Sequence, residues 1–108
     1  MSASTDIPLT ITPEAAARIA ELGMQNEFEQ MIEHTRQVVP ALAAIEVVRE
    51  LPYDTDSEPV SITAYWDRPY APEDNTSADL DRWVVEMFPP HVLEHMHIFL
   101  IHGRPHAR

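Results

Sequence analysis

The spacing of hydrophobic residues changes along this chain, and each spacing predicts a different element. In three segments the apolar side chains recur every three or four residues, which places them along one face of a helix. These segments are residues 13–22, 26–39 and 76–88. Thr12 and Pro13 form a good helix start, and Gly23 suits a left-handed stop. Asn26, with Glu29 three residues later, is the expected cap of the second helix.

Three other segments carry strand patterns. Residues 44–51 and 60–66 alternate between apolar and polar side chains, as half-buried strands do. Residues 96–101 form a nearly continuous apolar run, which predicts a strand that is buried on both faces and lies inside the sheet. Residues 91–96 are ambiguous, because Pro90 is also able to start one more helical turn.

The predicted order is therefore α-α-β-β-α-β within one α+β domain, since 108 residues suit a single core. We expect a three-stranded antiparallel or mixed sheet with the helices packed mainly on one face. The first two strands form an antiparallel hairpin, and a helical crossover makes the second and third strands parallel. Residues 1–11 and 103–108 are expected to be frayed tails. One core should bury six large side chains: Val47, Ile62, Trp83, Phe88, Ile98 and Leu100.

Composition narrows the chemistry and the partners. The chain has no cysteine and no lysine, which excludes disulfides, thiolate catalysis and lysine Schiff bases. Its net charge of −11 makes nucleic acid and anionic membranes poor partners and favours a basic protein or simple solubility. No segment resembles a membrane span or a signal peptide, so the expected location is the cytoplasm. We expect no cofactor.

Histidines are concentrated near the C-terminal end, where five of the six lie between residues 91 and 106. His91, His95 and His97 are the candidate metal ligands, because imidazole is a common ligand of zinc. A helix would pair His91 with His95, whereas a strand would pair His95 with His97. One backbone conformation therefore cannot align all three, and a third ligand from Glu94 or His34 would be needed.

An alternating acidic stretch gives a weaker metal candidate. Asp54, Asp56 and Glu58 resemble the first oxygen ligands of a calcium-binding loop. Such a loop needs glycine at its sixth position and an acid at its twelfth, where this chain has Pro59 and Tyr65. A solvated hairpin tip is the better interpretation.

Aromatic residues gather at the end of the second predicted strand. Tyr65, Trp66, Arg68 and Tyr70 are the candidate interface or ligand residues, because strand ends often present binding groups. The competing interpretation packs Trp66 under the third helix beside Trp83, with the tyrosines covering the sheet edge.

These features favour a non-catalytic protein–protein interaction module. It would form a homo-oligomer through an open sheet edge or the aromatic segment, or cover a basic partner as an inhibitor or immunity-type protein does. Two alternatives stay open. One is a small metal-dependent enzyme that uses the C-terminal histidines, and the other is a small-ligand-binding domain at residues 65–70.

Overall fold

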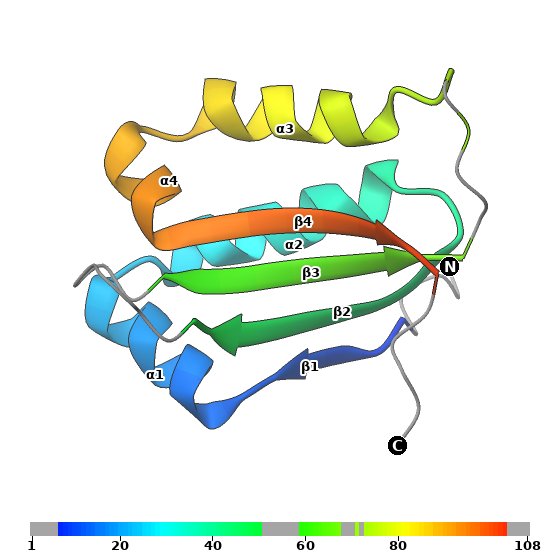
Figure 1. Cartoon of the computed structure of the whole chain (residues 1–108). Helices are drawn as coiled ribbons and strands as arrows, with labels where there is room; N and C mark the ends of the chain where they lie inside the picture. Colours follow the sequence, from blue (N-terminus) through cyan, green and yellow to red (C-terminus); the bar gives the residue numbers. More distant parts are fainter. Residues whose placement is uncertain (1–6, 51–58, 68–70, 72, 104–108) are drawn as a thin grey trace.

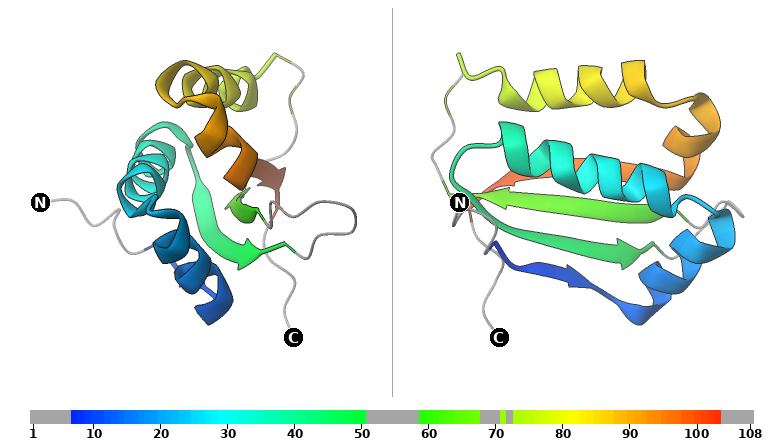
Figure 2. Two further views of the ribbon diagram at one scale, coloured as in Figure 1. Left: turned by 90° about the vertical axis from the view of Figure 1, so that its left-hand side faces the viewer. Right: turned by 180° about the vertical axis from the view of Figure 1, so that it is seen from behind.

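The computed structural model describes residues 7–50, 59–67, 71 and 73–103, which form a compact α+β domain. A four-stranded mixed sheet runs through these residues in the order β1-β2-β3-β4 (Figure 1). The helices all lie on one side of the sheet (Figure 2). In chain order the elements are β1 (Leu9–Ile11), α1 (Pro13–Leu22), α2 (Gln25–Val38), β2 (Leu42–Arg49), β3 (Val60–Trp66), α3 (Thr76–Met87), α4 (Pro90–His95) and β4 (Met96–His102).

Two β-α-α-β units make up this topology. Strand β1 pairs in parallel with β2, and β3 pairs in parallel with β4, while β2 and β3 form the predicted antiparallel hairpin. Each crossover moves the chain in the same direction across the sheet, from β1 towards β4, and the helices of both crossovers cover the same face. The strands of the first unit run opposite to the strands of the second. The crossovers therefore have opposite hands. The β1–β2 crossover is the left-handed one, which is the rare hand for such connections (Figure 1).

Helix ends follow the sequence signals with one exception. The Thr12 hydroxyl accepts a hydrogen bond from the Ala15 N–H at 3.2 Å, and Gly23 ends α1 with a left-handed φ of 68°. The second helix begins at Gln25 with Met24 as its N-cap, so the prediction that Asn26 caps it was wrong. Met24 is buried in the core immediately after Gly23.

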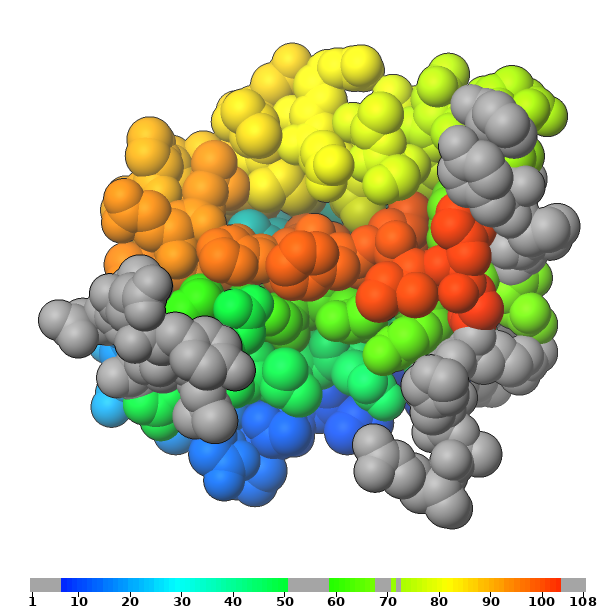
Figure 3. All heavy atoms as spheres, in the orientation of Figure 1, coloured from blue at the N-terminus to red at the C-terminus, as the bar shows by residue number. Residues whose placement is uncertain are grey.

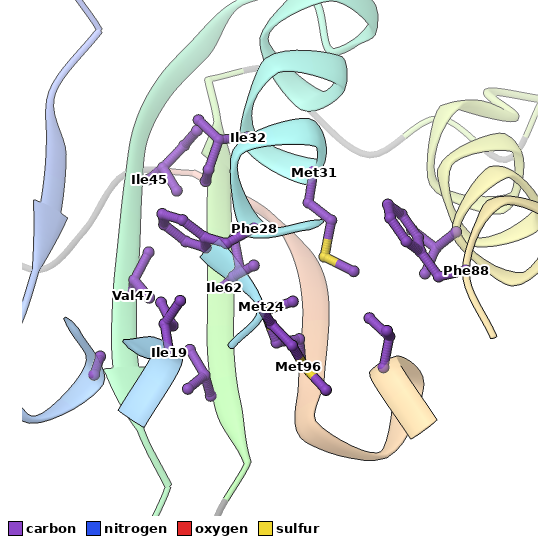
Figure 4. Packing of buried hydrophobic residues seen from close by; sticks show 14 of the residues in the cluster. Ile19, Met24, Phe28, Met31, Ile32, Ile45, Val47, Ile62, Phe88 and Met96 are labelled. Atoms are coloured by element: carbon purple, nitrogen blue, oxygen red, sulfur yellow. The ribbon is translucent and has the colours of Figure 1, made fainter. Parts of the chain in front are cut away.

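The core lies between the helices and the inner face of the sheet. Phe28 of α2 lies over Val47 and Ile62 of the central strands, and Met31 of the same helix points towards β4 and Phe88 (Figure 4). Val47, Ile62 and Phe88 are buried as predicted, and Trp83, Ile98 and Leu100 are only partly buried against the same core. Among the described residues, no helix is long and apolar enough to cross a membrane.

Two strand predictions need correction. Residues 9–11, which were expected in a frayed tail, form the short strand β1 beside β2. Three residues are too few to show a two-residue period, so the sequence carried little sign of this strand. The strand at 96–102 lies at the sheet edge rather than inside it, and its side chains Phe99 and Ile101 are 46% and 44% exposed. Its apolar run therefore reflects one core face and one uncovered apolar face.

Candidate functional site

The side of the sheet opposite the helices is the most distinctive surface of this domain. No described helix covers it (Figure 2), and we call it the uncovered face. Because side chains alternate along a strand, the neighbours of the core residues point to this side. The uncovered face consists of Glu46, Val48 and Glu50 from β2 and its end, Ser61, Thr63 and Tyr65 from β3, and His97, Phe99 and Ile101 from β4.

Apolar side chains are grouped on this face. Val48, Phe99 and Ile101 are 41%, 46% and 44% exposed. Strand pairing places Ile101 beside Tyr65 and Phe99 beside Thr63. Val48 lies on β2, across β3 from Phe99 and Ile101 on β4. Single exposed hydrophobic residues are normal on a protein surface, whereas several that share one face of a sheet are typical of a contact surface.

The polar groups on the uncovered face bond to one another. The Tyr65 hydroxyl donates to Glu46 Oε1 at 3.2 Å. Burial raises the pKa of Tyr65, and the nearby Glu46 carboxylate raises it further. The Ser61 hydroxyl donates to Glu50 Oε2, and His97 Nδ1 lies 3.7 Å from the same oxygen. Both carboxylates therefore have partners on their own face.

A serine, a histidine and a glutamate lie together on the uncovered face, and nucleophilic active sites use the same three residue types. A serine nucleophile needs a hydrogen bond to its base, with the acid behind the base. In this cluster the Glu50 carboxylate accepts directly from Ser61, and His97 faces the carboxylate. The contacts are those of a cross-strand polar network that joins β2, β3 and β4. Sequence reasoning missed this cluster because its members come from three separate segments of the chain and match no motif.

The aromatic candidates do not form one site. Tyr65 lies on the uncovered face, whereas Trp66 is 1% exposed and packs with Leu80 and Val39 on the helix side. Adjacent residues of a strand point to opposite faces, which separates this pair. The Trp66 part of the competing interpretation is therefore observed, whereas Tyr65 lies on the central strand β3 rather than at the sheet edge. Arg68 and Tyr70 lie outside the described residues.

The histidine candidates are also separated. His91 is exposed on α4, and its carbonyl oxygen lies 2.8 Å from His95 Nδ1. His97 follows the change from helix to strand and faces Glu50. Within residues 7–50, 59–67, 71 and 73–103, no three His, Cys, Asp or Glu side chains are grouped as metal ligands. The acidic stretch Asp54, Asp56 and Glu58 lies outside the described residues.

A second polar feature joins α2 to α3. The rings of His34 and Trp83 are stacked with centroids 3.7 Å apart and planes 5° apart. Glu29 and Glu33 are among the residues of an open depression of about 460 Å³ beside this pair. Desolvation lowers the pKa of His34 below its ordinary value of 6.5. The sequence offered His34 only as a spare metal ligand, and its role here is to connect two helices.

This lowered pKa predicts a pH dependence of stability. Below pH 6.5 the unfolded chain takes up a proton that folded His34 resists, so this contribution to stability is present above pH 6.5 and is lost as pH falls below it. We expect the free energy of unfolding of His34→Asn to fall less between about pH 7 and pH 5 than that of the parent chain. Urea unfolding at each pH measures both. Equal slopes for the two proteins would contradict the assignment.

No protein-family model, curated protein or solved structure matches this chain. The case for its function therefore rests on its own surface.

Proposed function

We propose that this chain is a non-catalytic protein–protein interaction module that self-associates through the uncovered face. The observation that carries this proposal is the group of exposed apolar side chains on a sheet side that no described helix covers. Packing of two such faces would remove Val48, Phe99 and Ile101 of each copy from water, and burial of apolar area is favourable.

The polar groups of this face support a second copy as the occupant. Glu46 and Glu50 already accept hydrogen bonds from Tyr65 and Ser61, so a partner need not supply donors for them. A symmetric contact requires one surface that complements itself. A face of apolar side chains and internally bonded polar side chains meets that requirement.

The size of the face sets the expected affinity. With strands about 4.8 Å apart and about 3.3 Å per residue, the part formed by β2 to β4 measures roughly 14 Å by 23 Å. That extent is smaller than the ~800 Å² that each partner buries in a standard stable interface. We therefore expect a weak, reversible dimer with a dissociation constant in the micromolar range.

The net charge of the chain distinguishes self-association from the main alternative, which is binding of a basic partner. Two copies that each carry −11 repel one another, so added salt should strengthen self-association. A basic partner would be attracted by the same charge, and salt would weaken that complex. The acidity of the chain thus favours binding of a basic partner as the second candidate function. Added salt should strengthen self-association and weaken binding of a basic partner.

Sedimentation equilibrium over a range of micromolar concentrations tests the proposal. We expect a monomer–dimer equilibrium that shifts towards dimer as salt rises from about 0.05 M to about 0.5 M. The double variant Phe99→Thr with Ile101→Thr keeps strand-forming side chains and removes apolar area from the face, so it should be monomeric.

Val38→Thr is the matched control, because Val38 is 40% exposed but belongs to α2 rather than to the uncovered face. It should associate as the parent chain does. A parent chain that stays monomeric to millimolar concentration, or a dimer that the double variant leaves intact, would overturn the proposal.

A further inference from the structure

A groove lies between α3 and the outer edge of β4, and it meets the uncovered face at His97. Its cavity measures about 240 Å³, and the space-filling view shows the surface hollowed between these two elements (Figure 3). We call it the α3–β4 groove. It is lined by Asp81, Val84 and Val85 of α3, Leu93 of α4, and Met96, His97 and Ile98 of β4.

One wall of this groove is a free strand edge. Among the described residues, β4 pairs only with β3, so its other edge presents backbone N–H and C=O groups without a strand partner. Proteins often protect such an edge with charge, proline or a bulge. The sequence of β4, from Met96 to His102, contains neither an acidic residue nor proline, and its pairing with β3 is regular.

The floor and the opposite wall are apolar. Five of the seven lining residues are Val, Leu, Met or Ile, and Val85 is 64% exposed at the rim. The cavity is smaller than the ~300–1,000 Å³ of a pocket for a drug-sized ligand. Its size and lining therefore suit an apolar side chain of a peptide better than a separate small molecule.

The charge of the α3–β4 groove is the third feature that a partner would recognise. Asp81 lines the groove, and its carboxylate makes no hydrogen bond or ion pair with any described residue. None of the described arginines lines the groove, and the whole chain carries −11. A partner with Arg or Lys next to its apolar side chain would meet a carboxylate that is free to pair.

We propose that the α3–β4 groove binds an extended segment of a basic partner protein, which adds to β4 as a further strand. The backbone of the segment would pair with the β4 edge, an apolar side chain would enter the groove, and a neighbouring Arg or Lys would reach Asp81. This proposal is distinct from self-association, because the groove shares only His97 with the uncovered face.

Charge argues against a second copy in this groove. Helix α3 lies in the helix layer beyond β4, and residues of both elements line the groove (Figures 1 and 2). A second copy would bring the same net charge of −11 to a groove that presents Asp81, whereas a basic segment would be attracted.

Selection from a library of short random peptides displayed on phage tests the proposal. We expect the enriched peptides to combine an apolar centre with Arg or Lys. A synthetic copy of an enriched peptide should bind the parent chain in fluorescence anisotropy. Val85→Arg, which places a bulky cation at the rim, should weaken that binding by about tenfold or more. Asp81→Asn should weaken it by a few-fold and reduce its salt dependence.

Met87→Arg is the matched control, because Met87 is 52% exposed on the same helix and does not line the groove. It should bind the peptide as the parent chain does. Far-UV circular dichroism of each variant separates lost binding from lost folding. The Phe99→Thr, Ile101→Thr variant should also keep peptide binding, which separates this proposal from self-association. Failure to enrich any peptide, or equal binding by Val85→Arg and Met87→Arg, would overturn the proposal.

Discussion

Replacing Trp66 with alanine should lower the free energy of unfolding by about 3–5 kcal/mol, as expected for truncation of a fully buried aromatic side chain. Trp66 is 1% exposed, and it packs with Val39 and Leu80 between the end of β3 and the helices. Urea unfolding followed by far-UV circular dichroism measures the change as a lower midpoint with a similar slope.

Trp83→Ala is the comparison variant for this prediction. Trp83 is only partly buried, with one ring face against His34, so its loss should cost roughly 1–3 kcal/mol. The sequence pattern placed Trp83 in the predicted core and left Trp66 open between an interface role and packing beside Trp83. A Trp83→Ala variant that is less stable than Trp66→Ala would show that the roles of the two tryptophans are reversed.

An aspartate at position 47 should unfold the domain, whereas an aspartate at position 48 should be tolerated. Val47 is completely buried on the helix side of β2, and a carboxylate there would be desolvated without a partner. We expect a loss of several kcal/mol, which is comparable to the ~5–15 kcal/mol total stability of a small domain. Val48→Asp, on the uncovered face, should lower the free energy of unfolding by no more than about 1 kcal/mol.

These two variants differ by one position in the same strand, so they test the face assignment itself. Expression, circular dichroism and urea unfolding of both proteins are sufficient. A folded Val47→Asp protein with near-parent stability would mean that β2 presents its faces the other way round.

The sequence predicted most elements because local signals and tertiary packing agree in them. Thr12, Gly23 and the apolar stripe of α3 each specify a helix boundary or face through interactions within a few residues. The β2–β3 hairpin follows in the same way from the period of two in residues 60–66. Where interactions within a few residues decide the conformation, the sequence pattern is sufficient to predict the element.

Long-range placement was the part that the sequence did not specify. The apolar run in β4 fits both a central strand and an edge strand with one uncovered apolar face, and only strand pairing distinguishes them. The Glu50, Ser61 and His97 cluster comes from β3, β4 and the residue after β2, so no sequence spacing connects its members. The aromatic candidates were separated by a simple alternation, which placed Tyr65 on the uncovered face and Trp66 in the core.

Thiol labelling tests most directly whether the uncovered face is the contact surface. The chain has no native cysteine, so Val48→Cys and Val38→Cys each give a single reporter, at sites with parent exposures of 41% and 40%. We predict that the labelling rate of the position 48 thiol falls as protein concentration rises through the micromolar range, while the position 38 thiol labels at a constant rate. Labelling of both thiols at rates that do not change with concentration would contradict the account.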